Sequence, residues 1–160
     1  MNAYQAELMA IFEAELEAFE EFLGILQIEA ETLQSRSVDA LPELTQLKSE
    51  QVSHLGQLAL ERSRLLKNQG FPPNAQGMSH WLYYYDFPDK TLTNYWLTIV
   101  ELARQAHDLN QKNGALIELK LMYNQQALNI LQSAATQLSV YDKGGQAHSA
   151  SLNKRELGKA

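Results

Sequence analysis

One pattern of apolar residues runs unbroken through the second half of the chain. From Leu92 to Ala134 its spacing alternates strictly between three and four residues, the average of about 3.5 that is typical of helices packed along a seam. A strand would repeat every two residues, so the pattern predicts one helix from Asp89 to about Val140, about 75 Å long at 1.5 Å per residue. The repeat positions are Leu92, Tyr95, Ile99, Leu102, Ala106, Leu109, Asn113, Leu116, Lys120, Tyr123, Ala127, Ile130 and Ala134.

The repeat passes through Asn113-Gly114, although Asn-Gly is the strongest short turn signal. A turn would almost always shift the phase of the repeat, and the phase does not change. The helix is therefore predicted to continue through Gly114, where glycine costs about 1 kcal/mol relative to alanine. A glycine inside a helix often marks the close approach of another backbone. Two helices hinged at Gly114 are the alternative.

Two helices are predicted before this one. Residues 3–35 carry an apolar stripe with glutamates on the remaining faces, and a second stripe begins at Asp39, a fair N-cap, with Pro42 in its first turn, and ends at Gly70. The link between them is short, so they should lie antiparallel. The first stripe is Leu8, Phe12, Leu16, Phe19, Leu23, Leu26, Ala30 and Leu33, and the second is Leu44, Leu47, Gln51, Leu55, Leu58 and Leu65.

The segment from Asn68 to Lys90 holds three of the four prolines and six of the fourteen aromatic residues. Met78 to Tyr85 is predicted as a short helix within it. Two interpretations of its aromatic-rich part, residues 71–88, stay open. It either covers one end of the bundle as an aromatic plug or forms a pocket that binds a ligand.

From these elements we expect an all-α fold, an elongated antiparallel bundle of long helices. Residues 1–140 would form the bundle from the two N-terminal helices, the aromatic-rich helical link and the long C-terminal helix. Residues 141–160 contain Gly144-Gly145, small residues, and four Lys or Arg residues against one acid in the stretch from Lys143. They are expected to form a flexible basic tail.

Composition narrows the class of protein. The chain has 160 residues, enough for one domain with a proper core, and no cysteine. The lack of cysteine excludes disulfides and thiolate zinc sites and favours a cytoplasmic location. The N-terminus fits neither a signal peptide nor a membrane-spanning helix. A net charge of -6 argues against nucleic acid as a partner, and the charge is uneven, because residues 1–35 hold eight glutamates and no Lys or Arg.

No pattern typical of catalysis or metal binding is present. Di-iron helical bundles need Glu-x-x-His pairs, and the sequence also has no His-Glu-x-x-His, phosphate loop or Gly-x-Ser-x-Gly. We therefore expect no catalytic residue, no metal, no cofactor and no enzymatic activity. The residues three before His54, His80, His107 and His148 are Gln51, Gly77, Arg104 and Gly145.

Residues 121–141 contain no charged side chain. On a helical wheel their apolar residues sweep about half the circumference, against the roughly 100° that a core-facing helix needs, with Asn124 inside the apolar arc. Burying a neutral amide that finds a hydrogen bond costs little, whereas burying an unpaired charge costs far more. The pattern favours a face that is part core and part groove for a partner helix; the alternative is that the whole arc packs inside the bundle. The arc consists of Leu121, Tyr123, Ala127, Leu128, Ile130, Leu131, Ala134, Ala135, Leu138 and Tyr141.

Three short motifs, covering about 40 residues, resemble the C-terminal region of the FlgN family of flagellar export chaperones. An Asn-x-x-Asn-Gly-x-Leu-Ile element is matched by Asn110, Asn113, Gly114, Leu116 and Ile117. An Asn-x-x-Ala-Leu-x-x-Leu element is matched by Asn124, Ala127, Leu128 and Leu131. A Tyr-Gly-x-x-Gly-Gln signature is matched by Tyr141, Gly145 and Gln146, with Asp142 where glycine is usual.

The resemblance implies a cytoplasmic chaperone that binds the helical termini of hook-associated proteins, prevents their premature assembly and delivers them to the export gate. Its partners would be these clients and components of the export gate and the export ATPase. A chaperone needs a second contact for the machine that takes over its cargo, and we expect Tyr141, Gly145 and Gln146 to dock on the gate. The alternative is that Tyr141 caps the end of the helix against the bundle. The motifs and the arc together give the candidate client-binding residues, which are Asn113, Gly114, Leu116, Ile117, Tyr123, Asn124, Ala127, Leu128 and Leu131.

A second class of function fits the same repeat. The chain could be a self-associating structural coiled coil, a helical adaptor with no export role. Asn113 at a core position suits that alternative as well, because a buried asparagine can fix the register of packed helices.

Overall fold

The computed structural model describes residues 3–35, 37–86 and 88–145, and describes side chains as far as residue 135. Within these ranges the chain forms four α-helices and no strand: α1 (Ala3–Gln34), α2 (Leu41–Asn68), α3 (Ala75–Tyr85) and α4 (Thr91–Gly145). The helices pack around shared apolar clusters, so the predicted all-α bundle is confirmed. The chain divides into two compact units, residues 1–117 and residues 118–160.

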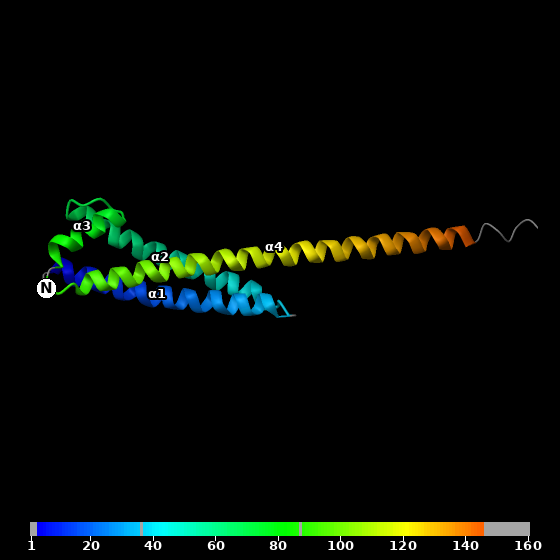
Figure 1. Cartoon of the computed structure of the whole chain (residues 1–160), viewed down its shortest axis with the longest axis horizontal. Helices are drawn as coiled ribbons and strands as arrows, with labels where there is room; N and C mark the ends of the chain where they lie inside the picture. The colour runs from blue at the N-terminus through cyan, green and yellow to red at the C-terminus, as the bar shows by residue number, and fades with distance from the viewer. Residues whose placement is uncertain (1–2, 36, 87, 146–160) are drawn as a thin grey trace, which may run out of the picture. The chain divides into compact units, whose positions relative to one another are not determined.

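In the first unit α1 and α2 lie side by side and run in opposite directions (Figure 1). Two ion pairs between them follow this direction. Glu15 in the first half of α1 contacts Arg62 in the second half of α2 at 2.8 Å, and Glu29 in the second half of α1 contacts Lys48 in the first half of α2 at 2.9 Å. The predicted antiparallel pairing is therefore confirmed.

Two glutamates of α1 are buried, which corrects the prediction that its glutamates occupy only the faces away from the stripe. Glu15 and Glu29 expose 2% and 3% of their surface. A buried carboxylate is costly unless it is paired and hydrogen-bonded, and each of these accepts two hydrogen bonds from one cation of α2. The buried residues of α1 are Leu8, Ile11, Phe12, Glu15, Ala18, Phe22, Leu26, Glu29 and Leu33.

The two ends of α2 follow different rules. Asp39 is not the N-cap, because the helix begins after Ala40, which makes no side-chain cap, and the Asp39 carboxylate instead accepts a hydrogen bond from Ser37 Oγ at 2.8 Å. At the other end Gly70 has a φ of 80°, a conformation that glycine adopts without penalty. The Phe71 N–H then donates to the Leu66 carbonyl at 2.9 Å. This glycine-capped ending agrees with the stop predicted at Gly70.

The short helix α3 begins at Ala75, three residues before its predicted start, because Asn74 caps it. Asn74 Oδ1 accepts a hydrogen bond from the Gly77 N–H at 2.8 Å. A Cβ at Gly77 would lie 1.9 Å from the Pro72 carbonyl oxygen, so only glycine lets α3 fold back onto the preceding loop. Its inner face is buried in the core of the first unit through Met78, Trp81 and Leu82.

Both interpretations of the aromatic segment find support within this unit. The buried face of α3 covers the apolar cluster that Leu8 and Phe12 of α1 share with Leu92 and Ile99 of α4, as a plug would. Part of α3, including the buried Leu82, also borders a hollow of about 480 Å³ against the start of α4. The residues lining the hollow are Ser79, Leu82, Tyr83, Asp86, Lys90, Thr93, Trp96 and Leu97.

Helix α4 begins at Thr91, where the buried Asp86 carboxylate accepts hydrogen bonds from the Leu92 and Thr93 backbone N–H groups at 3.2 and 2.6 Å. It is uninterrupted as far as Gly145, so the predicted continuity through Asn113-Gly114 is confirmed and the hinge does not form. The helix also extends beyond its predicted end near Val140.

The first part of the α4 repeat is buried at Leu92, Ile99, Ala106 and Asn113. The predicted close approach at Gly114 is wrong. Among the described residues, no atom would lie within 4 Å of a Cβ at this position. Gly114 therefore contributes no packing that an alanine would prevent.

Candidate partner-binding site

The uncharged stretch of α4 in the second unit is exposed. Every side chain from Leu121 to Ala135 is exposed to solvent. The expectation that part of the arc belongs to the core is therefore wrong for these residues. Contiguous exposed apolar surface on a protein usually marks an interaction site. We call the described apolar residues of this face the α4 arc; they are Leu121, Tyr123, Ala127, Leu128, Ile130, Leu131, Ala134 and Ala135. The five large members, Leu121, Tyr123, Leu128, Ile130 and Leu131, expose between 51% and 69% of their surface.

Six of the nine candidate client-binding residues are exposed. Tyr123, Asn124, Ala127, Leu128 and Leu131 lie in the second unit, and Gly114 lies in the first. Leu116 and Ile117 in the first unit are half-buried, and Asn113 is buried.

The environment of Asn113 explains why the helix passes through an Asn-Gly pair. Its side chain is 1% exposed, and Nδ2 donates to the Leu26 carbonyl and to Glu29 Oε2, both at 2.8 Å. Lys48 Nζ contacts the same carboxylate and also donates to Asn110 Oδ1 at 3.1 Å. These hydrogen bonds join α4 to α1 and α2. Asn113 Oδ1 has no partner within the part of the chain that the structure describes.

Tyr141 and Gly145, two of the three candidate gate-docking residues, lie within α4. Gln146 and the rest of the predicted tail fall outside the described residues.

The two buried glutamates of α1 are each paired with a cation of α2. Burial raises the pKa of Glu15, and the adjacent Arg62 guanidinium opposes this by charge attraction and hydrogen bonding. On the surface, hydrogen bonds from Arg104 and Gln105 lower the pKa of Glu101 to about 2. In the ranges described above, no group of three or more His, Asp or Glu side chains could hold a metal ion. No helix there is long and apolar enough to cross a membrane.

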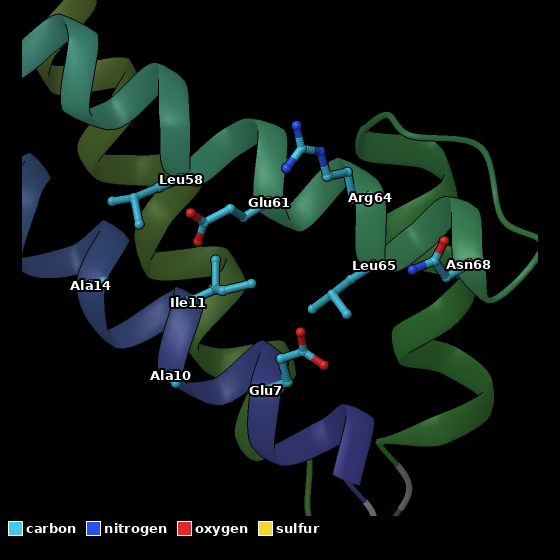
Figure 2. Close-up of a pocket in the computed structure, with 9 residues that line it drawn as sticks. All are labelled: Glu7, Ala10, Ile11, Ala14, Leu58, Glu61, Arg64, Leu65 and Asn68. Atoms are coloured by element: carbon cyan, nitrogen blue, oxygen red, sulfur yellow. The ribbon is translucent and has the colours of Figure 1, made fainter.

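A second surface feature is a groove between α1 and α2, which the sequence reasoning missed (Figure 2). It encloses about 450 Å³, and the apolar side chains of Ile11, Leu58 and Leu65 lie between the two ribbons. The one available signal was a pair of alanines four residues apart beside the stripe of α1. The lining residues are Glu7, Ala10, Ile11, Ala14, Leu58, Glu61, Arg64, Leu65 and Asn68.

An all-α bundle whose long helix carries an exposed, uncharged apolar arc is typical of helical proteins that bind other proteins through helix faces. The family model described as FlgN protein matches residues 1–149, and the chain belongs to the FlgN family. It is also similar to the flagella synthesis protein FlgN of Proteus mirabilis. The two are 28% identical over 153 residues, which cover 94% of this chain and 97% of the relative. No solved structure matches the chain. Membership of this family indicates a role in flagella synthesis.

Proposed function

We propose that this protein is a cytoplasmic flagellar export chaperone. It binds the helical termini of hook-associated proteins, prevents their premature assembly and delivers them to the export gate. Family membership and the relative's role in flagella synthesis support the flagellar part of the proposal. The observation that carries the binding part is the α4 arc, an exposed apolar surface without a charged residue.

The composition of the arc suits reversible binding of a partner helix. A client helix laid along it would bury large apolar side chains, each worth about 1.5–3 kcal/mol when fully removed from water. The polar residues that flank the arc are amides and hydroxyls such as Gln125 and Ser133. These groups can exchange water for hydrogen bonds to a partner at small cost, whereas charged residues there would be desolvated at high cost.

Within the arc, Leu128 and Leu131 are the proposed anchors. They sit three residues apart on one face and expose 51% and 66% of their surface. Truncating such an anchor in an interface hot spot typically costs about 2 kcal/mol or more. Tyr123, Asn124 and Ala127 complete the proposed client surface of the second unit.

Delivery needs a second contact, which we assign to Tyr141, Gly145 and Gln146. An aromatic ring with a polar hydroxyl is an effective small anchor at an interface. The basic residues that follow in the sequence can add long-range attraction to an acidic receptor.

The test of client binding is the double variant Leu128→Glu with Leu131→Glu, titrated with a purified hook-associated protein in isothermal calorimetry. Two carboxylates in the arc should abolish measurable binding while helicity by circular dichroism is unchanged. The matched control is Gln126→Glu with Asn129→Glu, which adds the same two charges at the same spacing on the polar face of α4. The control should bind within about twofold of the wild type.

Unchanged affinity of the leucine double variant, with helicity retained, would refute the arc as the client site. Light scattering separates the chaperone from the self-associating coiled coil. A monomer that becomes a one-to-one complex with client supports the chaperone. A stable dimer that does not bind the client supports the self-associating coiled coil.

A further inference from the structure

We propose that the groove between α1 and α2 is a second docking site, which binds a basic amphipathic helix of a partner protein. The groove belongs wholly to the first unit, and it shares no residue with the α4 arc. The inference therefore does not depend on the client site, and the two can fail separately.

The shape of the groove fits a helix. Ile11, Leu58 and Leu65 form an apolar floor, and on the α1 side Ala10 and Ala14 leave room for a backbone to approach (Figure 2). Two antiparallel helices with an apolar groove between them present the surface on which a further helix packs in a bundle. Its volume of about 450 Å³ accommodates several large side chains from one face of that helix.

Charge decides the chemistry of the occupant. Glu15 and Glu29 are neutralised by the cations of their buried pairs. Helix α1 carries six further glutamates, all exposed, and contains no Lys or Arg. These six are Glu7, Glu13, Glu17, Glu20, Glu21 and Glu31.

Helix α2 has three exposed acids, which are Glu43, Glu50 and Glu61, and two exposed cations, which are Arg64 and Lys67. Its other two cations, Lys48 and Arg62, are engaged in the buried pairs. The groove itself is lined by two carboxylates, Glu7 and Glu61, and by one guanidinium, Arg64, so its own charge is -1 and the acidic excess comes mainly from the surrounding surface of α1. A helix with an apolar stripe flanked by Lys and Arg would match this surface, and charge complementarity of this kind raises the rate and specificity of association.

The same charges argue against other occupants. A second copy of the chain docked through this groove would bring two acidic α1 helices together, and like charges facing each other are unfavourable. An anionic lipid surface would be repelled for the same reason. A basic helix of another protein is the occupant to which the proposal commits.

The probe is a 21-residue synthetic helical peptide with leucine at the heptad a and d positions and lysine or arginine at the remaining positions. Its fluorescence anisotropy is measured against the full chain at 150 mM salt. Two further peptides are needed, one with glutamate in place of every basic residue and one with the basic composition scrambled to remove the leucine stripe. The basic striped peptide should bind at least tenfold more tightly than either.

The variant Ala10→Arg places a long cationic side chain in the groove at an exposed position, so the fold should survive. It should weaken the striped peptide at least tenfold. Ala6→Arg is the matched control, since Ala6 is exposed on α1 but does not line the groove and the charge change is identical. It should bind within about twofold of the wild type. If Ala10→Arg alters the melting temperature, Glu7→Gln with Glu61→Gln replaces it and should weaken binding at least threefold.

Equal weakening by Ala10→Arg and Ala6→Arg, or equal binding of the scrambled peptide, would overturn the groove and leave only diffuse attraction to an acidic surface. The client-site variant Leu128→Glu with Leu131→Glu should bind the striped peptide as the wild type does. Loss of peptide binding in that variant would place the basic helix on the α4 arc and overturn the proposal.

Discussion

The hydrogen bonds of Asn113 allow a quantitative test of how α4 is attached to α1. Asn113→Ala removes a bond to the Leu26 carbonyl and a bond to the Glu29 carboxylate. A neutral hydrogen bond contributes about 1 kcal/mol and one to a charged group about 2 kcal/mol. The variant also removes the buried Oδ1 that lacks a partner among the described residues, and removing this unsatisfied atom offsets the loss of stability by about 1 kcal/mol. The expected loss is about 2 kcal/mol of the free energy of unfolding.

The assay is urea unfolding followed by circular dichroism. With a slope of about 1.5 kcal/mol per molar urea, the midpoint should fall by about 1.3 M. The control is Asn110→Ala, which loses one hydrogen bond to Lys48 at the surface and should cost no more than about 0.5 kcal/mol. Equal midpoints for the two variants would refute the reasoning, because the buried amide would then contribute no more than an exposed one.

Asn113→Asp tests the electrostatic part of the same argument. The introduced carboxyl group would lie against Glu29, and the like charge together with burial should raise its pKa in the folded state above its unfolded value. A group with a raised folded pKa loses its stability contribution as the pH rises through that pKa. The variant should therefore be much less stable than Asn113→Ala at pH 7 and should approach it near pH 4.

The functional readout for Asn113 concerns the client. The family motif places this residue in the client-binding set, whereas its side chain is buried against α1. We expect the folded Asn113→Ala protein to bind client within about threefold of the wild type. A tenfold loss with the fold intact would restore Asn113 to the client surface.

Three further predictions concern other parts of the chain. Because burial raises the folded pKa of Glu15, the contribution of Glu15 to stability falls as the pH rises through that pKa. The side chain of Glu15→Gln does not titrate, so urea unfolding should show the wild type losing stability relative to this variant between pH 4 and pH 7. A stability difference that stays constant over this range would contradict the prediction. Gly77→Ala must displace the Pro72 carbonyl and should cost about 2 kcal/mol or more, whereas Gly56→Ala, where no described atom would lie within 4 Å, should raise the melting temperature. Tyr141→Ala should leave client affinity within about twofold while weakening export-gate binding at least tenfold, and a parallel loss of client affinity would assign the residue to the client site.

Much of the fold follows from periodicity alone. The seam from Leu92 to Asn113 is set by a repeat that depends only on neighbouring residues of one helix, and the same holds for the continuity of α4 through Gly114. The periodicity of one helix does not predict which residues of another helix its side chains will contact. Glu15 and Glu29 fall on the buried face of α1 because cations of α2 reach them, and an acidic residue viewed alone is assigned to water.

The candidate site was predicted in part for the same reason. The lack of charge from Leu121 onward identified the arc, but whether that face meets a core or solvent depends on which other segments cover it. The sequence pattern of one helix does not contain that information. The groove between α1 and α2 was missed because it is a property of two helices together, and only the spacing of Ala10 and Ala14 hinted at it.

The two buried ion pairs also determine how α1 and α2 can be aligned. The carboxylates are fourteen residues apart on α1, and their cations are fourteen residues apart on α2. Sliding one helix by a heptad would set Glu15 opposite Leu55 or Gln69 and would leave both carboxylates without a cation. An uncompensated buried charge costs several kcal/mol, so the misaligned hairpins that a uniform leucine seam would tolerate are strongly disfavoured. The two glutamates that the sequence pattern assigns to the solvent-facing side of α1 thus favour a single register for this hairpin.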